Sequence, residues 1–145
     1  MKKIFVVISF VASLVLSGCS FLQETNNTLE YVNKATEHIN NLSNFADQAP
    51  QMIQQAALNA EVKTELENQV NSLVNEINEF NQIDAPTIAK DLHQQIVSKN
   101  NLILEELQPV IQNGQILVDK LEDTQIFITI KEINTLLNQL QQLGL

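Results

Sequence analysis

The sequence contains no arginine or tryptophan, and it has only one cysteine, three glycines and three prolines among 145 residues. A single cysteine excludes a disulfide within the chain. The eight basic residues are outnumbered by 17 acidic ones, and a net charge of −9 leaves no basic patch for nucleic acid. So few glycines cannot build a phosphate-cradling loop, whereas abundant Leu, Ile, Ala, Glu and Gln favour helices.

The first eighteen residues are divided like an export signal. Lys2 and Lys3 are positively charged, residues 4–16 are almost entirely apolar, and Ser17 and Gly18 are small. A membrane-spanning helix needs about 20 apolar residues, so the apolar stretch has the length of a signal-peptide core instead. Two other interpretations stay open: a transmembrane anchor, and a plain secretory signal followed by a chance cysteine.

Residues Leu16-Ser17-Gly18-Cys19 resemble the lipobox of bacterial lipoproteins. In that motif a diacylglyceryl group, with acyl chains such as palmitate, joins the cysteine thiol before a peptidase cuts, here between Gly18 and Cys19. Two acyl chains anchor a protein stably where one is marginal. We therefore expect Cys19 to be the lipid-attachment residue, with its amine either free or acylated. No other cofactor and no metal is expected.

Cleavage divides the chain into a signal peptide (residues 1–18), a lipidated tether (residues 19–27) and a domain (residues 28–145). It removes Lys2 and Lys3 and no acidic residue, so the net charge falls from −9 to −11. Anionic lipid repels such a domain, and we expect the lipid to do the holding while the domain stands off the membrane. The domain is long enough for one modest core.

Helical periodicity recurs along the domain. A first helix is predicted over residues 28–45, before a break at Gln48-Ala49-Pro50, because proline disfavours helix in the residue before it. A short helical piece over residues 51–58 and a second long helix over residues 61–80 follow. The residues predicted to face the core are Leu29, Val32, Ile39, Leu42 and Phe45, then Val62, Leu66, Val70, Leu73, Ile77 and Phe80.

A third long helix begins after Asp84-Ala85-Pro86, where an acidic residue and a proline suit a helix start. Lys99 interrupts its apolar stripe, and we expect the lysine stem to lie along the apolar surface with its amine in water. Pro109 weakens the last turn, and Asn113-Gly114 is predicted to cap it. The residues predicted to face the core are Ile88, Leu92, Ile96, Ile103, Leu107 and Val110.

A last helix follows a partial turn through Leu117 and Leu121, with Asp123 or Thr124 as its cap. Residues 126–130 alone could form a strand, but a lone strand has no partner and the helical spacing continues. Four amphipathic helices with short connections predict an all-α, antiparallel up-down bundle of about four helices. The core-facing residues of the last helix are Ile126, Ile130, Ile133, Leu137 and Leu140, with Leu136 and Leu143 widening the face.

No catalytic pattern is visible in the sequence. His38 and His93 lack the Glu-x-x-His spacing of carboxylate-bridged sites, so surface or rim positions are expected, with a metal shared by both histidines as the alternative. The acidic pairs Glu105-Glu106 and Glu122-Asp123 lack the alternating ligands of a calcium loop and are interpreted as solvated helix ends. No serine stands in a nucleophile elbow, and Cys19 is consumed by lipid. We interpret the chain as non-enzymatic.

Beyond the lipobox, three stretches match a known pattern: Thr28-Leu29-Glu30-Tyr31-Val32-Asn33, Gln48-Ala49-Pro50 and Leu136-Leu137-Asn138-Gln139-Leu140. With them the chain resembles the small uncharacterised lipoproteins of Bacillus-type Gram-positive bacteria, a family defined by a domain of unknown function. The resemblance implies a lipid anchor on the extracytoplasmic face of the cell membrane. It implies no activity.

Two functions from different classes stay open. The first is a non-catalytic structural or protein-interaction module of the cell envelope, which binds an envelope partner or itself. The second is a small-ligand-binding or accessory subunit with a cavity between its helices. A leftover apolar stripe on a packed helix favours the first function, and a closed polar cavity lined by Asn, Gln and His93 favours the second.

Overall fold

The structure is a computed structural model that describes residues 2–112 and 115–144, with side chains from residue 24 onward. Within these ranges the chain is helical apart from short connections and one two-stranded hairpin, which confirms the all-α prediction. The elements are α1 (Lys2–Ala56), α2 (Ala60–Asn81), the 3-10 helix η1 (Thr87–Ala89), α3 (Lys90–Leu107), β1 (Ile111–Gln112), β2 (Gln115–Ile116), α4 (Val118–Glu122), α5 (Ile126–Thr135) and α6 (Leu137–Leu143).

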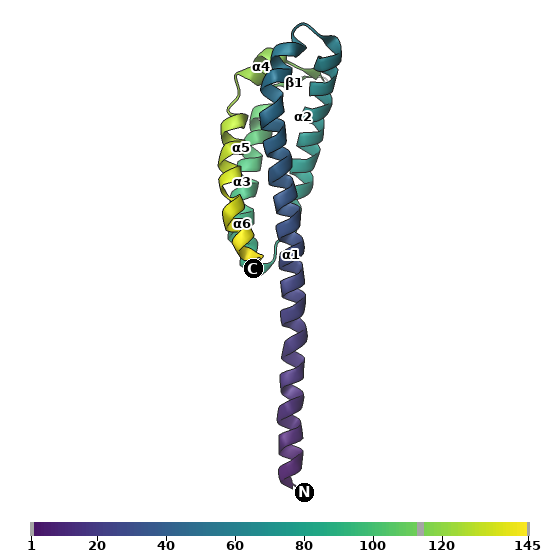
Figure 1. The fold of residues 1–145 in the computed structure, drawn as a ribbon, viewed down its shortest axis with the longest axis vertical. Helices are drawn as coiled ribbons and strands as arrows, with labels where there is room; N and C mark the ends of the chain where they lie inside the picture. The colour runs from purple at the N-terminus through teal and green to yellow at the C-terminus, as the bar shows by residue number, and fades with distance from the viewer. Residues whose placement is uncertain (1, 113–114, 145) are drawn as a thin grey trace.

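Helices α1, α2, α3 and the α5–α6 pair form an antiparallel up-down bundle (Figure 1). α1 packs against α2 and against α5 and α6, while α3 packs against α2 and α5. We call the end of the bundle where α1 leaves toward the N-terminus the proximal end; the α2–α3 connection and the end of α6 lie there. The opposite, distal end holds the α1–α2 turn, the hairpin and α4 (Figure 1).

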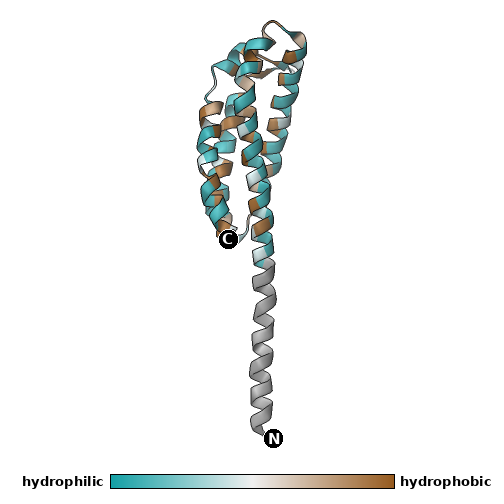
Figure 2. Cartoon of the chain, in the orientation of Figure 1, coloured by the Kyte–Doolittle hydropathy of each residue, from teal (hydrophilic) through white to brown (hydrophobic). Residues whose placement is uncertain are grey.

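The core is built from one apolar stripe on each helix, because apolar residues recur every three or four positions. Hydrophobic and hydrophilic residues accordingly alternate along each helix (Figure 2). α2 begins at Asn59, whose Oδ1 accepts hydrogen bonds from the backbone N–H of Glu61 (2.9 Å) and Val62 (3.4 Å), an N-cap of the usual kind. Val62, also predicted to face the core, is half-buried. The other five predicted residues are buried: Leu66, Val70, Leu73, Ile77 and Phe80.

The predicted break at Gln48-Ala49-Pro50 is wrong, because α1 continues through Pro50. A proline inside a helix loses a backbone hydrogen bond and crowds the preceding turn, which costs about 3 kcal/mol. Pro50 itself is exposed. Its neighbours on the inner face, Ala49 and Ile53, are only 0% and 4% exposed, so packing of that face offsets the local cost. The separately predicted piece over residues 51–58 is the last part of α1.

A hairpin between α3 and α4 was not predicted. α3 ends before Pro109, and the chain then forms two short antiparallel strands. The predicted cap Asn113-Gly114 lies outside the described residues. The strand register pairs Ile111 with Ile116 and Gln112 with Gln115.

The last predicted helix is two helices, α5 and α6, which meet at Leu136. The Leu136 N–H bonds to the carbonyl of Ile133 (2.9 Å), three residues earlier, so the helix tightens at this turn. The Leu140 N–H bonds to the carbonyl of Leu136 (3.0 Å), which restores the α-helical spacing of four residues. The partial turn near Leu121 is the short helix α4, with Leu121 fully buried. Residues 126–130 are helical, as predicted.

Two residues predicted to face the core are exposed instead. Leu29 and Ile88 are 42% and 61% exposed. Ile88 lies in η1 before α3 begins, and on α1 the inward positions at this level are taken by Thr28 and Tyr31, which are 7% and 2% exposed. Both exposed residues lie toward the proximal end of the bundle.

Candidate functional site

Both histidines contact the aromatic ring of Phe80 inside the bundle. His38 on α1 is only 3% exposed, so the prediction of a surface or rim position is wrong for this residue. Its ring stacks on Phe80 with centroids 4.2 Å apart and planes 8° from parallel. His93 on α3 is half-buried, with its centroid 5.3 Å from that of Phe80. Phe80 ends the apolar stripe of α2 and brings α1 and α3 into one cluster.

A chain of hydrogen bonds leads from His38 across the bundle. The amide of Asn100, which is 0% exposed on α3, donates from Nδ2 to Asn81 Oδ1 (2.8 Å). Its Oδ1 therefore faces His38 and accepts from the ring Nε2–H (3.2 Å). Asn81 Nδ2 donates onward to Asn101 Oδ1 (3.1 Å) at the surface. We call His38, Asn100 and Asn81 the polar layer; it ties α1, α2 and α3 together.

The polar layer fixes the tautomer of His38. Because Nε2 carries the proton that Asn100 accepts, the other ring nitrogen, Nδ1, has a free lone pair. It lies 4.0 Å from Glu76 Oε1, makes no hydrogen bond and does not reach solvent. Asn41 Nδ2 donates to the same Glu76 oxygen (2.5 Å). The Asn41 amide thus satisfies the carboxylate that faces His38.

Burial keeps His38 neutral. It lowers the pKa of the imidazole from 6.5 to about 4, more than the hydrogen bond to Asn100 raises it. Below that pH a proton on Nδ1 would face the Glu76 carboxylate. Nδ1 itself is buried and makes no hydrogen bond, while the side chain of His38 lines a hollow between α1 and α2.

A second pair extends the cluster toward the proximal end. The Tyr31 hydroxyl and His93 Nδ1 share a hydrogen bond of 3.3 Å, and the two rings meet edge to face with centroids 5.7 Å apart. Burial raises the pKa of Tyr31 to about 12, so the phenol stays protonated. Burial also lowers the pKa of His93, which the carboxylate of Asp84 partly offsets.

A hollow of about 450 Å³ opens to solvent beside this cluster, between α1 and α2. Glu37, Glu76 and Glu79 give it an acidic rim, and Lys34 stands at its edge. Within residues 24–112 and 115–144, no group of three or more His, Cys, Asp or Glu side chains is arranged to hold a metal ion. The two histidines therefore have no third ligand for a shared metal among the side chains that are described.

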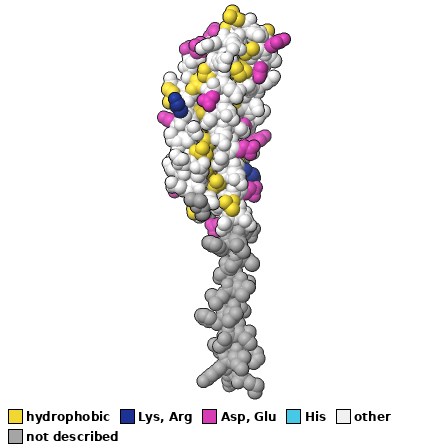
Figure 3. Space-filling model, viewed as in Figure 1, with side chains coloured by type: hydrophobic (Ala, Val, Ile, Leu, Met, Phe, Trp, Pro, Cys, Tyr) yellow, Lys and Arg dark blue, Asp and Glu magenta, His cyan; other side chains and the backbone are white. Residues whose placement is uncertain are grey.

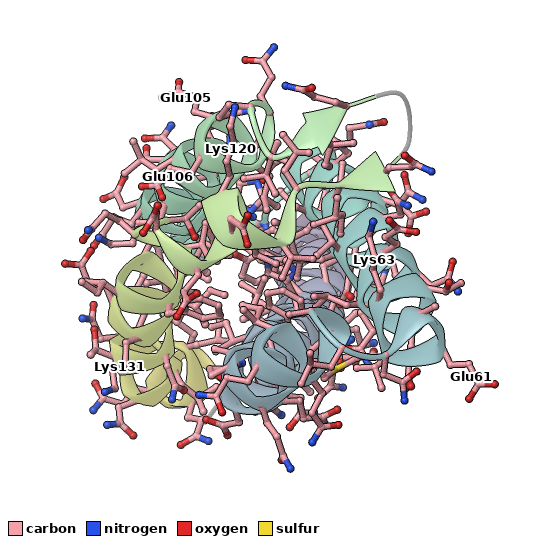
Figure 4. The ribbon with its side chains drawn as sticks, turned by 90° about the horizontal axis from the view of Figure 1, so that it is seen from above. Glu61, Lys63, Glu105, Glu106, Lys120 and Lys131 are labelled. Atoms are coloured by element: carbon pink, nitrogen blue, oxygen red, sulfur yellow. The ribbon has the colours of Figure 1, made fainter. Side chains whose placement is uncertain are left out.

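The acidic pairs singled out in the sequence lie at the distal end. Seen from that end, Glu105 extends outward from the bundle, as does Glu61 at the start of α2 (Figure 4). Glu106 Oε2 accepts a hydrogen bond from the backbone N–H of Gln125, just before α5. Glu122 and Asp123 are exposed where α4 ends. These contacts are those of solvated helix ends, as predicted.

The lipobox residues Leu16, Ser17, Gly18 and Cys19 lie outside the described side chains; the backbone there belongs to α1. Their roles stay predictions. Within residues 24–112 and 115–144, no helix has both the length and the apolar character needed to cross a membrane.

Sequence reasoning missed Asn100 and Asn81. The signal was present: Asn100 follows Ile96 by four positions and precedes Ile103 by three, which is the spacing of the core stripe. Lys99, the residue before Asn100, was predicted to interrupt this apolar stripe. In the structure Lys99 lies beside the stripe and its amine pairs with Glu132 on α5 at 2.6 Å.

Comparison with known proteins gives two matches. A model for a family of unknown function, DUF6376, matches residues 31–143. A Bacillus subtilis (strain 168) protein named uncharacterized lipoprotein YybP is 27% identical over 147 residues, which cover 99% of each chain. No solved structure matches the chain.

Proposed function

Because the chain belongs to the DUF6376 family, which confirms its resemblance to uncharacterised Bacillus lipoproteins, we propose a function from its geometry. The protein is a lipid-anchored, non-catalytic interaction module of the cell envelope. Lipid on Cys19 holds it on the extracytoplasmic face of the cell membrane after cleavage between Gly18 and Cys19. The relative's name as a lipoprotein and the Leu16-Ser17-Gly18-Cys19 sequence support this anchor.

One observation supports an interaction module over a cavity-binding subunit: the interior of the described bundle is filled. Its largest side chains are fully buried, and its polar layer hydrogen-bonds within itself. The hollows that stand out among the described residues measure about 200 to 510 Å³, and each is open to solvent. Small-ligand sites usually enclose most of the ligand, so surface recognition fits this bundle better.

The absence of catalytic geometry among the described residues supports a non-catalytic role. His38 is stacked, hydrogen-bonded and closed off from solvent. His93 pairs with Tyr31, whose pKa of about 12 keeps the phenol protonated at neutral pH, so it is a weak acid and its anion is scarcely populated. Apart from this phenol, the contacts that the structure gives place no nucleophile beside either histidine.

Crosslinking in intact cells tests the proposal. A photo-crosslinking residue placed at exposed positions of the domain should capture a defined envelope protein, or a second copy of the chain, while the protein sits on the membrane. Cys19→Ala is the control for the anchor, because it leaves residues 28–145 unchanged and removes the lipid-attachment thiol. The proposal predicts that this variant loses lipid labelling and keeps residues 1–18, since lipid joins the thiol before the peptidase cuts.

Two results would count against the proposal. Capture of nothing, from any face and across growth and stress conditions, would remove the interaction role. Unchanged lipid labelling of Cys19→Ala would remove the anchor.

A further inference from the structure

An apolar surface lies at the proximal end of the bundle. Leu29 of α1, Ile88 of η1 and Leu143 of α6 come from three separate elements and line one hollow of about 400 Å³, which we call the proximal patch. Its surface is more apolar than polar, and Leu29 and Ile88 are 42% and 61% exposed. Hydrophobic side chains are visible at this end of the described surface, next to the grey segment (Figure 3). The patch is smaller than the apolar surfaces of several hundred Å² that mark protein interfaces, so its position relative to the anchor carries the argument.

The proximal patch lies close to the predicted lipid. α1 is continuous from Lys2 to Ala56, so the chain from Cys19 to Thr28 is helical and its nine residue steps span about 14 Å. The polar interfacial layer of a bilayer occupies about 5–8 Å on each side of the hydrocarbon. If Cys19 lies at the hydrocarbon boundary, a helix tilt of about 55° or more from the membrane normal brings the patch into the headgroup layer.

Charge is distributed unevenly along the bundle. The proximal part, residues 24–34, 82–91 and 137–144, has four acidic residues (Glu24, Glu30, Asp84 and Asp91) and two lysines (Lys34 and Lys90). The distal part, residues 45–69 and 104–125, has two lysines (Lys63 and Lys120) and nine acidic residues: Asp47, Glu61, Glu65, Glu67, Glu105, Glu106, Asp119, Glu122 and Asp123. The net charges are −2 and −7.

This polarity weakens the repulsion that the total charge suggests. α2 alone is about 33 Å long, from its 22 residues, so even at a tilt of about 55° its distal end lies about 19 Å above a surface touched by the proximal end, more than two Debye lengths of about 8 Å. In the proximal part Lys34 pairs with Glu30 at 2.7 Å. An anionic membrane therefore repels the acidic distal end more strongly than the proximal end.

We propose that the proximal patch rests in the interfacial layer of the bilayer, so that the bundle leans toward the membrane while its acidic distal end still points away from it. The inference rests on the proposed anchor at Cys19. A second copy is a poorer occupant, because two exposed apolar side chains offer far less than the roughly 1,200–2,000 Å² that stable interfaces bury.

The test uses the mature lipoprotein in vesicles of phosphatidylglycerol and phosphatidylethanolamine. Cys19 is the only cysteine and its thiol carries the lipid, so Ile88→Cys introduces the only free thiol and can take a nitroxide label. Leu58→Cys is the matched control, because Leu58 is 94% exposed in the α1–α2 turn at the distal end. The collision rates of each label with oxygen, which partitions into lipid, and with a water-soluble nickel chelate report its depth.

The proposal predicts that oxygen outcompetes the nickel chelate at position 88 and that the order reverses at position 58. Leu29→Cys should behave like Ile88→Cys, which guards against an effect of one substitution. Equal, water-like accessibility at positions 29, 58 and 88 would overturn the inference. So would label–label broadening at position 88 that grows with protein density, because a second copy would then cover the patch.

Co-sedimentation with the vesicles separates the two claims. A protein that sediments with the vesicles while its label at position 88 reports water keeps the anchor and loses the inference. A protein that stays in the supernatant loses both.

Discussion

Two regions of the bundle depart from the rule that polar side chains face water and apolar ones face the core, and they depart in opposite directions. In the polar layer, His38 and Asn100 are 3% and 0% exposed. At the proximal patch, Leu29 and Ile88 are 42% and 61% exposed. Buried polar groups and exposed apolar ones are the informative exceptions in a folded protein.

The difference lies in where each region finds its partners. The polar layer finds them inside the chain, since Asn100 bonds to both His38 and Asn81. Apart from His38 Nδ1, the polar atoms of this layer are hydrogen-bonded, and such a network specifies how helices align. At the proximal patch, by contrast, the described residues leave Leu29 and Ile88 exposed, and the patch lies on the side of the predicted anchor. Variants of the first region should therefore change stability, and variants of the second should change membrane contact.

The largest expected effect is acid destabilisation through His38. Its pKa is about 4 in the fold against 6.5 when unfolded, so between these values the unfolded chain binds a proton that the folded chain does not. The free energy of unfolding should fall as pH drops from 6.5 to 4, by about 3 kcal/mol from this group. Urea unfolding across that range measures it.

His38→Gln is the control, because its amide can still donate to Asn100 but does not titrate. His93→Gln removes the smaller contribution of the same sign from His93, whose pKa is also lowered. A His38→Gln variant with the same acid dependence as the parent would show that the imidazole is not held neutral.

Asn100→Ala should cost about 2 kcal/mol of stability, because it leaves the buried Nε2–H of His38 without an acceptor. Asn101→Ala is the matched control: it is the adjacent, exposed asparagine, and its loss should cost no more than about 0.5 kcal/mol. Chemical unfolding of both variants measures the contrast. Equal losses would mean that the polar layer contributes nothing beyond an ordinary surface hydrogen bond.

Tyr31→Phe removes one hydroxyl from the buried cluster and keeps its ring. The hydrogen bond to His93 is 3.3 Å long, and its loss should cost about 1 kcal/mol. The pKa of His93, followed by NMR titration, should change in the same variant, because His93 Nδ1 loses its partner. An unchanged titration curve would show that the two groups do not interact in solution.

The smallest expected effect is at the proximal patch. Ile88→Gln and Leu58→Gln should each change the free energy of unfolding by less than about 0.5 kcal/mol, since both side chains are largely exposed. A loss of about 2 kcal/mol or more in Ile88→Gln would place this residue in the core. The proximal patch would then be part of the fold, and the comparison between the two regions would fail.

The sequence predicted the bundle well wherever the apolar spacing was uninterrupted. α2 follows its stripe from Leu66 to Phe80, and α5 is helical despite the β-branched run over residues 126–130. It failed where tertiary packing overrides a local signal, as at Pro50. The residues of that local segment alone do not determine the outcome.

The two exceptional regions were harder to predict than the helices. A buried asparagine such as Asn100 requires knowing that Asn81 and His38 meet it from two other helices. The charge polarity was hidden by the total of −11, because it arises only when antiparallel packing brings residues 45–69 and 104–125 to one end. The predicted up-down bundle would have allowed the net charge of each end to be summed separately.

The chemistry of the mature N-terminus is the most direct test of the proposed lipid anchor at Cys19. The first lysine after the predicted cleavage point is Lys34, so trypsin should release one peptide from Cys19 to Lys34. Mass spectrometry of the protein extracted from membranes should find that peptide beginning at Cys19 with a diacylglyceryl group on it, its amine free or acylated. A peptide that extends upstream of Cys19, or one with an unmodified thiol, would contradict the account.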